Sequence, residues 1–464
     1  MQRILAIAGL TWKAALRFKL FLVIAVLLVL AVVGLPLIIR TDGSAEGFTQ
    51  IILTYTLSAI TALLGFSTLW LSCGTLARDI EEGQIQVLAT KPVARWQIWL
   101  GKWLGIVSLN AALLAISGGC VFGLLQWRAS RQPAAVQRVL HEQIMVSRGS
   151  AKEPSSVAAI DAATDQVLQQ KLKSTPVEQV NLPEVRRQIR EMVSANWQLV
   201  PPGYTRTWHI NLGAAKNYLH GRPLQLRVKF NTADRSPSGT FDALWMVGNP
   251  PKTKYWRTEE DSPMSLAPDT FHEFSIPADL YDQDGILTIT FMNPNPTALL
   301  FPLNEGMEVL YPESSFGLNF IRGLGIIFCW MALLSALGLA AASLLSFPVA
   351  AFFSLAMMLV VLSSGMLAES VDNGTVAAGN EETGQRGHTV VDGVLIPAFR
   401  GVLAVVNVVK DFSPIDALST GRSITWSELG LAFVQIVGVM GGAFAVVGII
   451  FFSRRELATA QGIQ

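Results

Sequence analysis

Residues 78–95 combine acidic, basic and apolar side chains in one short stretch, and their spacing suits recognition of a partner protein. Ile80, Val87 and Leu88 stand at positions i, i+7 and i+8, which places them on one face of a short helix. Pro92 would end such a helix. An amphipathic helix can dock into a groove of a soluble protein. The alternative is a plain connecting loop with solvated charges, and the pattern alone leaves both interpretations open.

The common catalytic motifs are absent from the sequence. No Gly-x-x-x-x-Gly-Lys-Ser/Thr phosphate-binding loop occurs, and Gly101-Lys102 is followed by Trp103. Neither Gly-x-Ser-x-Gly nor His-Glu-x-x-His is present, which removes the commonest hydrolase motifs. The histidines are too scattered for a metal site: His141, His209, His220, His272 and His388. We therefore expect a chain that is not an enzyme and that holds no metal or cofactor of its own.

The elements that must position residues 78–95 are apolar. Only 15% of the 464 residues are charged, whereas a soluble domain carries about 25% charged residues. Five windows contain no charged residue at all: 20–39, 48–77, 103–127, 323–368 and 429–453. Each is long enough to cross a ~30 Å hydrocarbon core as a helix, which needs about 20 apolar residues. The chain is thus predicted to lie in a lipid bilayer, and its net charge of +1 gives no indication of a nucleic-acid partner.

Proline and charge patterns predict the number and orientation of the spans. The window 323–368 is too long for one helix and is interrupted at Ser346-Phe347-Pro348, which gives six transmembrane helices in all. Short cytoplasmic loops carry an excess of Lys and Arg. Residues 1–19 and 78–102 contain four basic residues each, and the last window is followed by Arg454-Arg455. We therefore expect both termini in the cytoplasm.

This orientation divides the chain into three parts. Residues 1–127 would hold a basic N-terminal helix and three spans, and residues 316–464 three more. The charged segment 128–315 would lie outside, helical over 133–200 and then a β-sandwich over 205–311. The predicted fold class is an α-helical polytopic membrane protein with a large external α+β insert that contains an antiparallel β-sandwich.

The division of the insert rests on a change of period. The run from Glu184 to Trp197 is the clearest helix. Alternation of apolar and polar residues then predicts half-buried strands, first at Leu224, Leu226, Val228 and Phe230 and again at Leu287, Ile289 and Phe291. Further strands are predicted at Phe241–Val247 and Glu308–Tyr311.

The segment 369–428 is harder to assign. Residues 369–392 are polar and rich in glycine, which predicts an external loop. The apolar run 394–409 is interrupted by Pro397 and Arg400. An arginine at the centre of a span costs about 2.5–3.5 kcal/mol on insertion scales, which favours a short re-entrant or interfacial helix over a seventh span.

The loop between the second and third predicted spans resembles the first cytoplasmic loop of ABC-2 type transporter permeases. The resemblance rests on an acid-x-Gly pattern, an apolar run, Lys-Pro, Arg-Trp and Gly-Lys, here Glu81, Glu82, Gly83, Leu88, Lys91, Pro92, Arg95, Gly101 and Lys102. The stretch 412–421, Trp426 and the final Phe452-Ser453-Arg454-Arg455-Glu456 are similar too. The resemblance covers residues 1–127 and 316–458, and Gln84 departs from it where a threonine often follows the glycine.

The resemblance implies a function and a set of partners. The loop would form a coupling helix that contacts a separate ATPase subunit, with Asp79, Glu81, Glu82, Gly83, Leu88, Lys91, Pro92 and Arg95 as the coupling residues. ATP and Mg²⁺ would be bound by that partner. The chain would be the permease of an exporter in a bacterial inner membrane, or would transmit force to periplasmic partners. It would act as a homodimer or pseudo-dimer.

A second hypothesis belongs to another class of protein. The external insert could recognise a glycan or peptide, and the chain would then be a membrane-anchored binding or sensor protein. An aromatic binding face could be formed by Trp208, Trp245, Tyr255 and Trp256. Burial of these side chains in the core of the sandwich is the simpler interpretation, since large aromatic side chains dominate cores.

Overall fold

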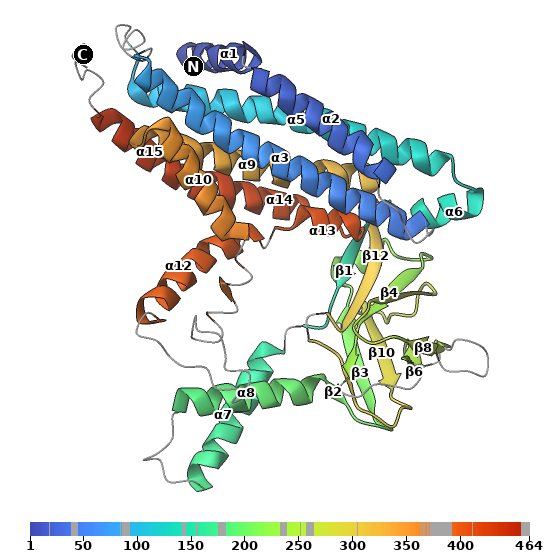
Figure 1. Cartoon of the computed structure of the whole chain (residues 1–464). Coiled ribbons are helices and arrows are strands. Elements are labelled where there is room, and N and C mark those ends of the chain that lie inside the picture. The colour runs from blue at the N-terminus through green and yellow to red at the C-terminus, as the bar shows by residue number, and fades with distance from the viewer. Residues whose placement is uncertain are drawn as a thin grey trace. The chain divides into compact units, whose positions relative to one another are not determined.

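The structure, a computed structural model, describes all residues except 18, 39–44, 84, 86–92, 142–144, 155, 175–181, 233–238, 251, 257–263, 304, 363, 365–366, 369–370, 372–391, 411 and 456–464. The chain divides into two compact units. We call Met1–Ser147 together with Ser315–Gln464 the helical unit, and Arg148–Ser314 the insert unit. Figure 1 shows the helices of the first and the strands and helices of the second.

The helical unit consists of long apolar helices and a few short ones. Its helices are α1 (Gln2–Arg17), α2 (Lys19–Ile38), α3 (Ala45–Glu81), α5 (Arg95–Ser130), α6 (Ala134–Val139), α9 (Phe316–Leu344), α10 (Phe347–Leu362), α12 (Asp392–Lys410), α13 (Pro414–Ser419), α14 (Trp426–Ala432) and α15 (Gly442–Arg454). A π-helical segment, η4 (Phe433–Gly441), joins α14 to α15. The three therefore form one continuous helical stretch (Figure 1).

Within the described residues, five helical stretches are long and apolar enough to cross a membrane, and they indicate a membrane-spanning protein. They are Gln50–Glu81, Arg95–Ser130, Phe316–Leu344, Asp392–Ser419 and Trp426–Arg454. The predicted number of six spans is not confirmed. Two apolar helices in windows predicted to span, Val23–Leu35 and Phe347–Val361, fall below that length over the residues the structure describes.

The segment 394–409 lies in the helix α12, Asp392–Lys410, so a helix is found where one was predicted. The stretch Asp392–Ser419 has the length and composition of a span, and the choice between a re-entrant helix and a seventh span stays a prediction. Pro397 lies inside α12 without ending it. Pro397 is the sixth residue of α12, beyond the first turn, so it removes one hydrogen bond of the helix without ending the helix.

The break between α9 and α10 confirms the prediction from Ser346-Phe347-Pro348. Helix α9 ends at Leu344 and α10 begins at Phe347, so that Pro348 occupies the first turn of the new helix. Proline is favoured there because its fixed φ suits the helix and its missing N–H has no partner to lose.

Helix α9 forms the centre of the helical unit. In its apolar window 72% of the residues are buried, against 22% in the last helical stretch. Close packing with α3 requires glycine, since a Cβ atom on Gly338 would lie 2.6 Å from the Cβ atom of Ser72. Small residues at such crossings allow two backbones to approach in a membrane, where no hydrophobic effect drives helices together.

The insert unit combines short strands with two helices. The strands are β1 (Val146–Ala151), β2 (Leu199–Val200), β3 (Thr205–Asn211), β4 (Leu224–Val228), β5 (Asn231–Thr232), β6 (Phe241–Val247), β7 (Lys254–Trp256), β8 (Met264–Leu266), β9 (His272–Ile276), β10 (Ile286–Met292), β11 (Leu299–Leu300) and β12 (Met307–Ser315). The helices are α7 (Val157–Ser174) and α8 (Leu182–Gln198), with a short 3₁₀ turn η3 (Gly213–Asn217). The strands predicted from alternating residues are confirmed as β4 and β10, and the two further predicted strands as β6 and β12.

The larger sheets are antiparallel and share one core. One sheet has the order β1-β12-β4-β9, and the other has the order β3-β10-β6-β7 with β8 beside β6. In the first, Leu226 pairs with Phe274 and Val309. Inward side chains of both sheets form a single buried cluster that includes Leu226, Val309, Trp208, Trp245 and Ile289. Two sheets over a common core have the arrangement of a β-sandwich.

One strand lies where the sequence predicted helix. The sequence predicts helix over residues 133–200, and α7 and α8 agree, but Val146–Ala151 forms β1. The strand is placed by its partner β12 at the edge of the first sheet. Its sequence Val-Ser-Arg-Gly-Ser-Ala shows no apolar alternation, so local pattern carries no signal for it.

Candidate functional site

The predicted coupling residues begin at the end of α3. Asp79 and Glu81 lie in its last turn, and Glu82 and Gly83 follow. Gly83 adopts a left-handed φ of 71°, and its N–H donates to the carbonyl of Ile80 at 3.2 Å. Glycine commonly ends helices in this conformation because it has no Cβ atom to clash. The acid-x-Gly pattern thus marks a helix end.

The structure tests only part of the predicted loop helix. Ile80 belongs to the long helix α3 rather than to a separate short helix. Leu88, Lys91 and Pro92 lie outside the described residues, as does Val87. Arg95 is the first residue of α5, so the two ends of the loop are defined by α3 and α5.

A buried ion pair joins these two helices. The ammonium of Lys102 on α5 donates to the carboxylate of Asp79 on α3 and to the backbone carbonyl of Thr75, the latter at 2.7 Å. The Lys102 side chain is only 7% exposed. An ammonium removed from water in this way needs such partners, because an unpaired buried charge is strongly destabilising.

Glu81 connects the end of α3 to the start of α10. Its Oε1 atom accepts a hydrogen bond of 2.9 Å from the backbone N–H of Phe347, the first residue of α10. Arg78 stacks on the same residue, with its Cζ atom 4.5 Å from the Phe347 ring centre. A carboxylate at a helix N-terminus satisfies a free N–H group and interacts favourably with the helix dipole.

Two arginines hold the ends of α15 and α9. The Nη1 atom of Arg95 lies 3.0, 2.8 and 2.8 Å from the backbone carbonyl oxygens of Phe452, Ser453 and Arg455 at the end of α15. Arg455 in turn donates to the carbonyls of Ala342 and Ser343 near the end of α9, at 3.4 and 3.3 Å. Cations at helix C-termini pair with the last carbonyls and with the negative end of the dipole.

We call Asp79, Glu81, Arg95, Lys102 and Arg455 the polar clasp. Together they connect the adjacent ends of α3, α5, α9, α10 and α15 in the helical unit. Within the described part of the chain, no group of three or more His, Cys, Asp or Glu side chains could hold a metal ion. The hydrogen bonds and the ion pair of the clasp each hold one helix end against another, so their role is structural.

Sequence reasoning missed part of this site. Glu81 and Phe347 are 266 positions apart, and no local pattern predicts that one caps the other. The packing of α1 on α5 has a signal in the sequence, because Gly101 and Gly105 have the spacing of small residues at which two helices pack closely. A Cβ atom on either glycine would come within 2.7 Å of α1, at Ile7 and Thr11 respectively.

The aromatic residues of the insert unit do not form one exposed face. Trp208 and Trp245 are 2% and 1% exposed and lie in the core, which confirms the simpler interpretation for both. Tyr255 is 68% exposed. The two tryptophans pack edge-to-face against Phe301 in the interior of the sandwich and cannot contact a ligand.

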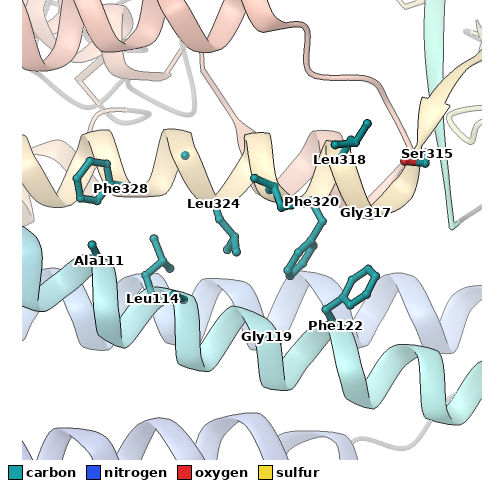
Figure 2. Close-up of a pocket in the computed structure, with 13 residues that line it drawn as sticks. Ala111, Leu114, Gly119, Phe122, Ser315, Gly317, Leu318, Phe320, Leu324 and Phe328 are labelled. Atoms are coloured by element: carbon teal, nitrogen blue, oxygen red, sulfur yellow. The ribbon is translucent and has the colours of Figure 1, made fainter.

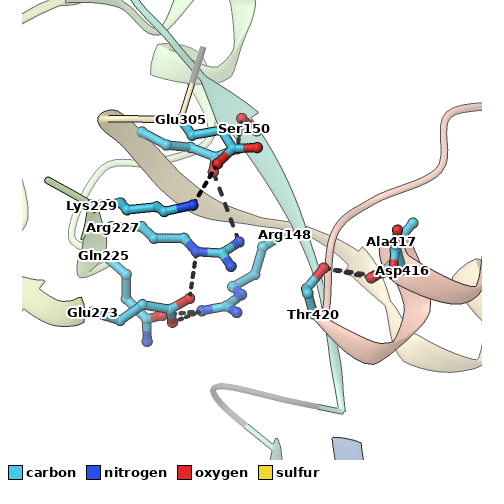
Figure 3. A network of polar contacts seen from close by, with 11 residues as sticks. Arg148, Ser150, Gln225, Arg227, Lys229, Glu273, Glu305, Asp416, Ala417 and Thr420 are labelled. Atoms are coloured by element: carbon cyan, nitrogen blue, oxygen red, sulfur yellow. Dashed lines mark hydrogen bonds and ion pairs between the residues drawn. The ribbon is translucent and has the colours of Figure 1, made fainter. Parts of the chain in front are cut away.

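A charged network covers one face of the β1-β12-β4-β9 sheet (Figure 3). Arg148 donates to Gln225 and to Glu273, the latter at 2.8 Å, and the side chain of Arg148 is 5% exposed. Arg227 lies between Glu273 and Glu308, at 3.5 and 3.9 Å. Cross-strand pairs of opposite charge favour one strand register, so the network specifies how these strands align.

An apolar groove of about 690 Å³ lies between α5 and α9 of the helical unit (Figure 2). Phe122 faces Phe320 across it, with ring centres 5.8 Å apart. Gly119 and Gly317 contribute no side chain to its walls. Among the lining residues only Ser315 is polar, so the groove offers apolar contact and no group for chemistry.

Comparisons of the chain with protein-family models, with curated proteins and with solved structures find no match. The resemblance of the loop to a permease family therefore rests on the residues of this sequence, and the site must be interpreted from its geometry.

Proposed function

We propose that this chain is the permease subunit of an ABC-2 type transporter in a bacterial inner membrane, which drives export or transmits force to periplasmic partners. A separate ATPase subunit would bind ATP and Mg²⁺ and would dock on the loop between Gly83 and Arg95. The observation that supports the proposal is the polar clasp, because the residues that resemble the family's coupling loop join α3 to α5 and bind the ends of two further helices, α10 and α15.

The clasp would transmit a movement of the loop to the helices that it connects. The Lys102–Asp79 pair holds α3 and α5 together, so that a push on the loop would move both helices as one body. Arg95 would carry the displacement to α15, and Glu81 would carry it to α10. Rigid helices joined at their ends are the elements through which such coupling travels.

The proposal includes a second permease copy, as a homodimer or pseudo-dimer. The last helical stretch, Trp426–Arg454, is only 22% buried in one chain and exposes large apolar side chains such as Phe433 and Val439. In a membrane such a face contacts lipid or another helix. Both termini would face the cytoplasm, and the insert unit would be external.

The test is copurification of the tagged chain from its native membrane, with mass spectrometry of bound proteins and an ATPase assay. We expect an ATPase subunit to copurify. Glu82→Lys reverses an exposed charge at the loop, and Gly83→Ala strains its left-handed backbone, so both should reduce coupled ATP hydrolysis. The matched control is Glu191→Lys, an exposed glutamate of α8. Absence of a copurifying ATPase, or coupled hydrolysis that both loop variants leave unchanged, would overturn the proposal.

A further inference from the structure

A polar cleft of about 510 Å³ opens between three loops of the insert unit. His220 comes from the turn after η3, Asn249 and Lys252 from the connection between β6 and β7, and Asp279, Tyr281 and Gln283 from the connection between β9 and β10. None of these residues belongs to the polar clasp. The cleft therefore requires an explanation that the proposed permease function does not supply.

Asp279 organises the cleft from an unusual backbone conformation. Its φ is 61°, a left-handed value that non-glycine residues rarely adopt. The carboxylate accepts hydrogen bonds from the backbone N–H of Gly221 at 3.3 Å and lies 3.2 Å from Nδ1 of His220. Lys252 donates to the Asp279 backbone carbonyl at 3.3 Å. One residue thus ties all three loops together, as is typical of preorganised binding sites.

Neighbouring contacts hold the loops in place. Gly248, which begins the β6–β7 connection, has a φ of 93°, and a Cβ atom there would lie 3.2 Å from the carbonyl oxygens of Leu280 and Lys252. The ring of Tyr281 is buried, and its hydroxyl donates to the carbonyl of Lys216 at 3.4 Å. A ligand would meet an assembled cleft, so little ordering entropy would be lost on binding.

The groups in the cleft are a mixture of donors and acceptors. The His220–Asp279 hydrogen bond lowers the pKa of the Asp279 carboxyl, so that this side chain is an acceptor at neutral pH. The side chains of Asn249 and Gln283 provide amide donors and acceptors, and no hydrogen bond within the described residues engages either of them. Lys252 adds an ammonium.

This mixture discriminates between classes of ligand. An anion such as phosphate would be repelled by the carboxylates of Asp279 and Asp282. The cleft has too few cationic groups to neutralise both these carboxylates and a bound anion. A metal ion would need three suitable side chains, and the described residues contain no such group. A ligand with adjacent hydroxyl groups fits better, because each hydroxyl both donates and accepts hydrogen bonds. Such groups can pair with the amides, the carboxylates and the imidazole that alternate in the cleft. Pro250 and Leu280 offer a small apolar surface for C–H groups.

We propose that this cleft binds a neutral carbohydrate through Asn249, Gln283, Asp279 and His220. The inference does not depend on the ATPase partner, and it assigns a ligand class to the insert unit. The binding groups are side chains on preorganised loops, a common placement for recognition on a sandwich scaffold.

The experiment uses the full chain in lipid nanodiscs, because sugar-based detergents would compete. Maltotetraose, cellotetraose and fully N-acetylated chitotetraose are titrated separately and followed by calorimetry and saturation-transfer NMR. We expect saturable binding of at least one of them. Asn249→Ala combined with Gln283→Ala should weaken it about tenfold or more, since buried polar groups of the bound sugar lose their partners. Tyr255→Ala, an exposed aromatic residue that does not line the cleft, is the control and should bind as the wild type does.

Three outcomes would overturn the inference. The first is a lack of saturable binding of all three tetrasaccharides up to about 10 mM. The second is binding that the double variant leaves unchanged, which would place the sugar elsewhere. The third is saturable binding of inorganic phosphate that Lys252→Ala abolishes, which would make the cleft an anion site. None of these outcomes bears on whether an ATPase copurifies with the chain.

Discussion

Lys102 on α5 donates a hydrogen bond to the carboxylate of Asp79 on α3, and the two side chains are 7% and 25% exposed. The attraction within a buried pair is offset by the loss of hydration of both ions. The main effect of the pair is therefore to fix the positions of the two helices, because Lys102 can contact Asp79 only when the last turn of α3 lies beside the first turns of α5. The loop between these helices begins and ends at fixed points.

The ion pair predicts a specific pattern of stabilities. Asp79→Leu and Lys102→Met should each destabilise the chain by about 3–5 kcal/mol, because each removes one partner of a buried pair. The double variant Asp79→Leu with Lys102→Met should recover most of that loss. Thermal unfolding in detergent, arranged as a double-mutant cycle, measures the coupling. Purely additive losses would show that the two side chains do not interact.

The packing of α1 on α5 predicts a position-specific effect of a single methyl group. Gly105→Ala places a Cβ atom 2.7 Å from the Cβ atom of Thr11, so α1 must shift, at a loss of about 1–3 kcal/mol. Gly119→Ala on the same helix is the control, since nothing lies within 4 Å of its Cβ position. We expect faster tryptic cleavage after Lys13 in Gly105→Ala alone. Equal cleavage in the two variants would contradict the contact.

The fold could be predicted from the sequence where local pattern decides it. Pro348 marks the start of α10, and the alternation in Leu224–Val228 marks β4, because each signal lies within the element that it specifies. The strand Val146–Ala151 could not be predicted in this way, since its pairing with β12 decides its conformation. The helix α12 was predicted to within two residues at each end, and Pro397 lies inside it without ending it.

In the candidate site, too, local sequence predicts some features and tertiary packing decides the others. The sequence identified Asp79, Glu81 and Arg95 as residues of interest, but not their contacts. Arg95 binds carbonyl oxygens at the end of α15, more than 350 positions away, so only the packing of the helices brings them together. The cleft around Asp279 had no sequence signal either, because its loops meet through the sandwich topology.

The Asp279–His220 hydrogen bond predicts a stability that depends on pH. The bond holds the Asp279 pKa below its ordinary value, with a smaller contribution from the Gly221 N–H. The stability that the carboxylate contributes is therefore present above the unfolded pKa of about 4 and is lost as pH falls through the lower folded value. Asp279→Asn keeps a residue that tolerates a left-handed backbone but removes the charge.

Thermal unfolding of the full chain between about pH 6 and pH 2.5 checks this expectation. The wild type should unfold at a higher temperature than Asp279→Asn at the upper end of that range, and the difference should close as the pH falls below about 4. Tryptophan fluorescence provides the signal, since Trp208 and Trp245 lie in the core of the insert unit. A difference that widens towards low pH would contradict the sign of the shift.

Asn319 on α9 predicts a large effect from one buried amide. Its Nδ2 atom donates to the carbonyl of Arg422 at 2.6 Å, and its Oδ1 atom accepts from the N–H of Ile424 at 2.8 Å. Asn319→Leu would leave both backbone groups without a partner in an apolar setting, a loss of about 2–4 kcal/mol. Asn407→Leu, an exposed asparagine of α12, is the matched control and should change stability little. Thermal unfolding separates the two variants, and proteolysis between Gly421 and Trp426 should accelerate only in Asn319→Leu. If the two variants behaved alike, the amide would not be what holds residues 422–424 against α9.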